Sequence, residues 1–145
     1  MSVKDLLGAK GGAAVISIPE HITVLAAAER LRLEGIGALV VASDGVMVEG
    51  IISERDIIWG LAQFGPEMTR EPVSRMMARQ TWTTRPDASL KDVMRLMTLH
   101  RIRHLPVVED GRLREIISIG DVVKQRLHEM ELEAGVLHDW ALAHR

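Results

Sequence analysis

The chain contains an internal repeat of about sixty-six residues, and this repeat constrains the fold more than any other feature of the sequence. The segment 17–61 reads SIPEHITVLAAAERLRLEGIGALVVASDGVMVEGIISERDIIWGL. It aligns with the segment 84–127, which reads TRPDASLKDVMRLMTLHRIRHLPVVEDGRLREIISIGDVVKQRL. A repeat of this length indicates two copies of one structural unit. We call these segments the first and the second repeat.

Each repeat carries the same succession of local signals. A cap residue, Thr23 or Ser89, opens a helix whose apolar residues recur at i, i+3, i+4 and i+7. A strand follows (ALVVA or HLPVVE), then Asp-Gly as a hairpin signal, then a second strand that ends in Ile-Ile. Ser-x-x-Asp, at Ser53 and again at Ser118, then opens a second helix. The pattern predicts a β-α-β-β-α unit, twice.

One such unit cannot cover its own small sheet, so the two repeats are expected to pack together as a pseudo-two-fold pair. The predicted fold class is therefore α/β, of the α+β type, with a helical extension at the C-terminus. Pro66 and Pro72 mark a linker that contains a short helical piece. The predicted division is the first repeat with an N-terminal segment, the linker, the second repeat and a helical tail, at 1–63, 64–78, 79–128 and 129–145.

The composition argues against several function classes. Eighteen Lys and Arg against twenty Asp and Glu leave a formal charge of −2, so no overall basic field is available to hold nucleic acid. The chain has no cysteine, which excludes disulfides, thiolate metal ligands and a cysteine nucleophile. No segment approaches the ~20 apolar residues of a membrane span, and charged residues interrupt any secretory signal near the N-terminus. A cytoplasmic protein without a membrane or nucleic-acid partner is expected.

The Ser-x-x-Asp motifs that open the second helix of each repeat have two interpretations. In a capping box, Ser53 and Ser118 accept from the third helical N–H, and Asp56 and Asp121 reach back to the backbone of the cap residue. The same spacing occurs at Ser89, where nothing suggests a ligand. Because a helix N-terminus also suits phosphate and a carboxylate suits ribose hydroxyls, the matching placement after a strand in both repeats favours a nucleotide site.

With these motifs, the chain resembles a tandem pair of cystathionine-β-synthase (CBS) domains, also called a Bateman module. The residues that carry the resemblance are GIISERDII, HRIRHLPVVEDGRL and IISIGDVVK, and it extends from about Val3 to Leu127. The resemblance implies clefts between the repeats that bind a regulatory, adenosine-containing ligand such as AMP, ADP, ATP, NAD or S-adenosylmethionine. It implies no catalytic cofactor.

The resemblance also implies roles for individual residues. Asp56 and Asp121 would hold ribose, and Ser53 and Ser118 would meet ribose or phosphate. The remaining candidates are Arg103 and His104 for phosphate, Arg55 as a further contact, and the backbone near Leu105 and Pro106 for adenine.

The two clefts are not expected to be equal. Arg103 and His104 align with Gly37 and Ala38 of the first repeat, so one cleft should hold phosphates better. The glycine before the Ile-Ile strand of the first repeat, Gly50, is replaced by a glutamate in the second. The sequence leaves open which cleft Arg103 faces, because each is lined by both repeats.

The histidines and serines do not form a recognisable metal or catalytic centre. His100 and His104 stand four residues apart, but the helix is predicted to stop near Arg101 and no third ligand is spaced to join them. No serine has a partner histidine at the same point of both repeats, so no catalytic residue and no enzyme is predicted. The predicted function is a stand-alone ligand-sensing regulatory module with an unknown effector protein. The alternative is a nucleotide-free dimeric scaffold.

The C-terminal segment carries a narrow apolar seam, at Leu127, Met130, Ala134, Leu137 and Ala141. Either it packs on its own domain or it meets the same helix of a second subunit. Apolar residues on the helices that begin at Ser53 and Ser118 favour a homodimer formed through those helices.

Overall fold

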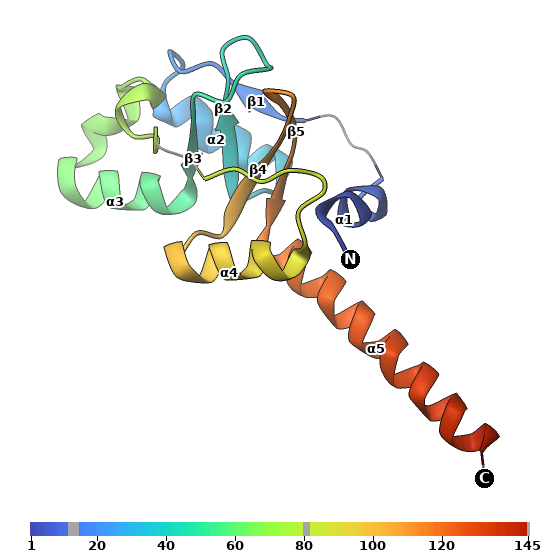
Figure 1. Ribbon diagram of the computed structural model, residues 1–145. Helices are drawn as coiled ribbons and strands as arrows, with labels where there is room; N and C mark the ends of the chain where they lie inside the picture. Colours follow the sequence, from blue (N-terminus) through green and yellow to red (C-terminus); the bar gives the residue numbers. More distant parts are fainter. Residues whose placement is uncertain (12–14, 80–81, 145) are drawn as a thin grey trace.

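The structure, a computed structural model, describes residues 1–11, 15–79 and 82–144. The first repeat comprises β1 (Ser17–Ile18), α2 (Val24–Glu34), β2 (Ala38–Val41), β3 (Gly50–Ser53) and α3 (Glu54–Phe64). The second comprises α4 (Leu90–His100), β4 (His104–Glu109), β5 (Arg112–Ser118) and α5 (Ile119–Ala143). Helix α1 (Val3–Ala9) precedes both, and the short 3-10 helices η1 (Pro66–Arg70) and η2 (Val73–Arg75) lie between them. The strands occupy the centre of the molecule, and α5 extends away from it (Figure 1).

The four predicted helix starts are confirmed. The side chains of Thr23, Ser53, Ser89 and Ser118 each accept a hydrogen bond from the backbone N–H three residues later, at 3.0 to 3.3 Å. Each cap residue therefore satisfies one of the free donors at its helix start.

The strands form two small sheets that match the predicted repeat. β1, β2 and β3 form one sheet, with β1 parallel and β3 antiparallel to β2. β4 and β5 form an antiparallel pair. The first predicted strand of the second repeat is reduced to a single parallel bridge between Thr84 and Val107. The mixed α/β fold class is confirmed, with the second sheet shorter by one strand.

The two Asp-Gly dipeptides produce different turns. Asp110 and Gly111 both adopt positive φ, 51° and 76°, and close a two-residue hairpin between β4 and β5. In the first repeat the side chain of Asp44 instead accepts from two following backbone N–H groups, within a longer loop. The carbonyl of Val46 in this loop accepts the N–H of Leu113 at 2.8 Å. This bond joins the first repeat to β5 of the second.

Each repeat has its own buried core, and a third cluster joins them. The joining cluster consists of Val40, Ala42 and Leu113, with Val15, Val48 and Ile116 packed against it. Because Val40 and Ala42 come from the first repeat and Leu113 from the second, burial of this cluster holds the pair together.

Each repeat is covered by a segment that lies outside it in the sequence: the linker that follows the first repeat, and α1, far ahead of the second. Val73 of the linker is buried in the core of the first repeat and donates its N–H to Ile22 O at 2.8 Å. Val3 of α1 is buried in the core of the second repeat and donates to Ala88 O at 2.9 Å. In space, α1 thus belongs to the second repeat, although the predicted division along the chain assigns it to residues 1–63. That division remains a prediction.

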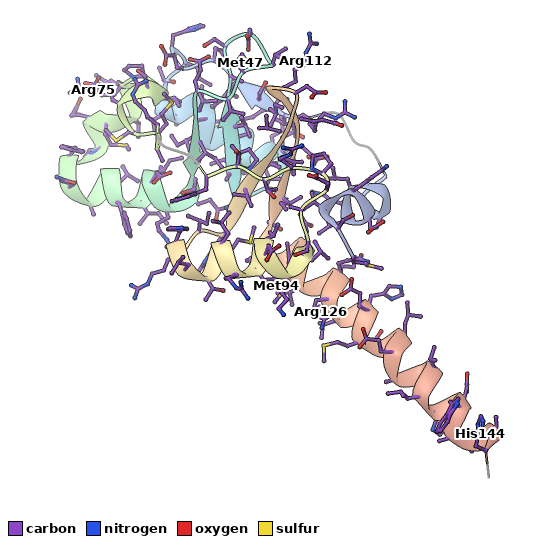
Figure 2. The ribbon with its side chains drawn as sticks, in the orientation of Figure 1. Met47, Arg75, Met94, Arg112, Arg126 and His144 are labelled. Atoms are coloured by element: carbon purple, nitrogen blue, oxygen red, sulfur yellow. The ribbon has the colours of Figure 1, made fainter. Side chains whose placement is uncertain are left out.

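Helix α5 continues without a break from the second repeat to Ala143. Every described residue from Glu131 onward is exposed, and the side chains radiate outward as far as His144 (Figure 2). The apolar seam therefore does not pack on its own domain. Among the described residues, no helix is both long and apolar enough to cross a membrane.

Candidate functional site

A cavity of about 280 Å³ lies between the two repeats. It is lined by Gly37, Ala38, Ile51, Ser53, Glu54, Arg55, Asp56, Trp59, Ala78, Arg101, Ile102, Arg103 and His104. The volume is close to the lower end of the ~300–1,000 Å³ of small-molecule sites. Five of the nine predicted site residues meet here. Sequence reasoning did not establish that the Ser-x-x-Asp motif of one repeat and the Arg-His pair of the other line the same cavity.

The first wall of the cavity is the N-terminus of α3. Asp56 Oδ2 accepts from the backbone N–H of Ser53 at 2.8 Å and from its hydroxyl at 2.9 Å, which completes a capping box. The capping interpretation is therefore correct for this motif. The hydrogen bonds that Asp56 accepts within the described residues all end on Oδ2, so Oδ1 remains available to a ligand hydroxyl.

The opposite wall is the turn between α4 and β4. α4 ends at His100, as predicted, and Arg101 adopts a left-handed conformation with φ 53°. This turn directs Arg103 and His104 into the cavity, while the Arg103 carbonyl accepts the N–H of Ile119 at 2.8 Å. A Cβ placed on Gly37 would lie only 3.1 Å from Nε2 of His104. The glycine that aligns with Arg103 thus makes room for the neighbouring histidine.

Burial in this cavity lowers the pKa of His104 below its ordinary value of 6.5. The negative charges of Glu54 and Asp121 oppose this shift, and the positive charge of Arg103 adds to it. A histidine with a lowered pKa is neutral near pH 7. Permanent positive charge in the cavity therefore comes from the three lining arginines, at positions 55, 101 and 103.

The other predicted site residues lie elsewhere. Leu105 and Pro106 are buried in β4 and do not line the cavity. Ser118 and Asp121 form a capping box at the start of α5 that matches the one at Ser53. Neither lines the cavity, and Asp121 instead pairs with Lys10 at 3.0 Å. The structure therefore places the two Ser-x-x-Asp motifs in different surroundings.

Trp59 is a lining residue that sequence reasoning missed. It follows Arg55 by one helical turn, and the guanidinium carbon of Arg55 lies 5.8 Å from the centre of its ring. The sequence did contain a signal: Trp59 stands four residues after the candidate Arg55, and residues at this spacing are neighbours on a helix surface. Its side chain is 63% exposed and offers a flat apolar surface beside the cavity.

The histidines do not converge on a metal centre. The ring of His100 stacks on Trp82, with centroids 3.8 Å apart, whereas His104 faces the cavity. Within the described ranges, no group of three His, Cys, Asp or Glu side chains has metal-binding geometry.

The sequence profile of the CBS domain matches the chain twice, over residues 12–63 and 68–128. The chain belongs to the CBS-domain family. The CBS domain-containing protein YhcV of Bacillus subtilis (strain 168) is 30% identical over 126 residues, which cover 87% of this chain and 86% of YhcV. The crystal structure of the CBS-domain containing protein ATU1752 from Agrobacterium tumefaciens has a TM-score of 0.82 and 40% identity, covering 87% of this chain and 99% of that one.

A third similar CBS protein has bound ligands. The CBS domain pair of protein MJ0100, crystallised in complex with 5′-methylthioadenosine and S-adenosyl-L-methionine, is 26% identical to this chain. Its TM-score is 0.77, and the match covers 89% of this chain and 98% of that one. Both of those ligands are adenosine derivatives. A domain pair with this fold therefore binds adenosine-containing ligands in at least one related protein.

The buried position of His104 predicts a pH-dependent stability. Because its folded pKa lies below 6.5, the unfolded chain binds more protons there, and stability falls as the pH drops through that value. We expect the His104 ring to titrate below pH 6.5 in NMR, and His104→Gln to reduce the loss of Tm between about pH 8 and 5.5. His138→Gln, an exposed histidine of α5, is the control. Titration of His104 at or above 6.5 would contradict the desolvation argument.

Proposed function

We propose that this CBS pair is a regulatory module that binds an adenosine-containing nucleotide, such as AMP, ADP, ATP, NAD or S-adenosylmethionine, in the cavity between its repeats. The observation that carries the proposal is the meeting of two motifs from different repeats. Asp56 at the start of α3 faces the same cavity as Arg103 and His104 at the start of β4. A ligand that contacts both motifs bridges the repeats, and this is how binding would reach the rest of the module.

The chemistry of the lining fits the three parts of a nucleotide. Ala38, Ile51 and Ile102, with Trp59 at the margin, supply apolar surface for a base. Asp56 supplies a carboxylate oxygen for ribose hydroxyls. The arginines supply charge-assisted hydrogen bonds for phosphate. The site contains two carboxylates, Glu54 and Asp56, against three guanidinium groups, so an anionic ligand is favoured over a cationic one.

The ribose role of Asp56 can be separated from its capping role. Asp56→Ala should weaken AMP binding by roughly 10- to 100-fold, since a hydrogen bond to a charged group contributes about 1.5–3 kcal/mol. The lost cap should cost only about 1 kcal/mol of stability. Asp5→Ala is the matched control, because Asp5 Oδ2 accepts from the N–H and the hydroxyl of Ser2 at 2.8 and 2.9 Å in the same capping box, outside the cavity. Calorimetry with AMP measures the affinity, and thermal unfolding measures the stability.

The outcomes of this experiment distinguish ligand binding from capping. If both variants lower Tm and neither changes the AMP affinity, the motif at Ser53 serves only to cap α3. A thermal-shift screen of the wild-type protein with AMP, ATP, NAD and S-adenosylmethionine identifies the ligand class. A ligand present at 100 times its Kd should add about 2.7 kcal/mol to the free energy of unfolding.

Arg103 is proposed to bind phosphate. Arg103→Ala should weaken AMP by roughly 10- to 100-fold and leave adenosine almost unchanged, because only AMP offers the anionic partner of the lost bond. Arg112→Ala removes an exposed arginine of β5 that lies outside the cavity, and should change neither affinity. Titration of both ligands into each variant decides the role. Equal losses for AMP and adenosine, or none for either, would refute a phosphate contact.

We propose that the module is a homodimer formed through α3 and α5. The motivation is a set of exposed apolar residues on these helices: Ile58, Leu61 and Phe64 on α3, and Ile119, Val123 and Leu127 on α5. Such a concentration of exposed apolar side chains marks an interaction surface. The regulated effector protein would then bind a surface other than this one, or a surface that only the assembled dimer presents.

Light scattering tests the dimer directly. At micromolar concentration the protein should have about twice its chain mass of 16.1 kDa. Ile58→Glu should shift it toward the monomer, because a buried unpaired charge opposes association. Leu33→Glu changes a more exposed leucine on α2 and should leave the mass unchanged. A wild-type monomer would contradict the proposal.

The nucleotide-free scaffold is the remaining alternative, and the exposed apolar surfaces of α3 and α5 are the observation that favours it. It predicts a dimer that no nucleotide in the screen stabilises. The proposal assigns the protein no catalytic role and keeps the cytoplasm as the expected compartment.

A further inference from the structure

The Ser-x-x-Asp motif of the second repeat is occupied by a side chain of the same protein. Lys10, at the C-terminal end of α1, donates from Nζ to Asp121 Oδ2 at 3.0 Å and to the carbonyl of Ile116 at 3.1 Å. Asp121 Oδ2 also accepts the N–H of Ser118 at 2.9 Å. The Lys10 ammonium group therefore binds the Asp121 carboxylate and the backbone of β5 at the same time.

The first repeat shows that this arrangement is not a requirement of the motif. Asp56 makes its capping bonds without a basic partner among its described contacts. The carbonyl of Ile51, which is equivalent to that of Ile116, accepts from the backbone N–H of Ala78 at 2.9 Å. Ala78 lines the cavity beside Asp56 and leaves that carboxylate open. The second repeat instead presents a lysine at the corresponding place.

The lysine is held in position by the helix that carries it. Val3 and Leu6 of α1 are buried in the core of the second repeat, with exposures of 0% and 2%. The Lys10 N–H closes the helix on the Leu6 carbonyl. An anchored side chain competes with a free ligand at a high effective concentration, because its translational entropy is already lost. Removing the ammonium would therefore unmask the carboxylate.

The ionisation of Asp121 is consistent with this occupancy. Burial alone would raise its pKa, but the hydrogen bonds from Ser118 and Lys10 and the charge of Lys10 outweigh burial and hold the pKa below its ordinary value of 3.8. The Asp121 carboxylate is therefore charged near pH 7, which favours its ion pair with Lys10.

We propose that Lys10 closes the second nucleotide-binding position, so that each chain binds a nucleotide only in the cavity at Asp56. This inference rests on the proposed function of that cavity. It assigns Lys10 the role of a built-in competitor for the carboxylate that would otherwise accept ribose, and it makes the stoichiometry one nucleotide per chain. Any partner or modification that draws α1 away would open a second site.

The test counts AMP sites by isothermal titration calorimetry on the full chain. Wild-type protein should bind one AMP per chain, and Lys10→Ala should gain one further site, with an affinity raised roughly 10- to 100-fold over the wild-type second position. Lys10→Arg keeps the positive charge and should gain none. Lys4→Ala removes an exposed lysine of the same helix and is the matched control. The double variant Lys10→Ala/Asp121→Asn should lose the added site.

The gain caused by Lys10→Ala decides this inference, whereas the wild-type count decides the proposed function. No gain in Lys10→Ala overturns the role of Lys10, whatever the wild type binds. Loss of a wild-type site in Lys10→Ala would also overturn it, because the lysine would then be a ligand contact. If the wild type binds no AMP but Lys10→Ala binds one in an Asp121-dependent manner, the inference stands and the cavity at Asp56 is not the site.

Discussion

The packing of the two repeats through Val40, Ala42 and Leu113 is the interaction on which the rest of the structure depends. Neither small sheet can bury both of its faces alone, and the bond from Leu113 N–H to Val46 O fixes the register of the two units. This packing brings the turn after α4 against the start of α3. Residues almost fifty positions apart in the sequence, Asp56 and Arg103, therefore line one cavity. Without the joining cluster, each motif would be an ordinary helix cap or an exposed basic turn.

The elements of the fold were predictable because their signals are local. The caps at Thr23 and Ser89 and the strand 104–109 follow from propensity and hydrophobic pattern, and the structure confirms them. The site was predictable only in part, because its composition depends on which repeat faces which. No periodicity shows that Arg103 lies across from Asp56 or that Lys10 reaches Asp121. Those contacts depend on how the two repeats and α1 are placed relative to one another. A single sequence carries no direct signal for that placement.

The two Ser-x-x-Asp motifs differ because different segments cover the two repeats. Gly50 is required in the first repeat because a Cβ there would lie 2.8 Å from the Ala78 carbonyl, where the linker passes over β3. The second repeat is covered by α1 instead, and Glu115 is accepted at the equivalent place, with its own carboxylate bonded to the Ile116 N–H. The covering segments, rather than the repeats themselves, thus set the difference. The two repeats thus share their packing, while their two capping motifs have separate surroundings.

Helix α3 connects the cavity to the exposed apolar surface. Its first turns supply Asp56 and Trp59 to the cavity, and the same helix exposes Ile58, Leu61 and Phe64. A ligand that repositions the start of α3 also moves the apolar side chains, because a helix transmits a shift along its length as a rigid element. The ligand can shift the assembly equilibrium only by the difference between its affinities for two arrangements of α3. Regulation by this protein would then require no catalytic chemistry, only a nucleotide that binds one arrangement of α3 more tightly than the other.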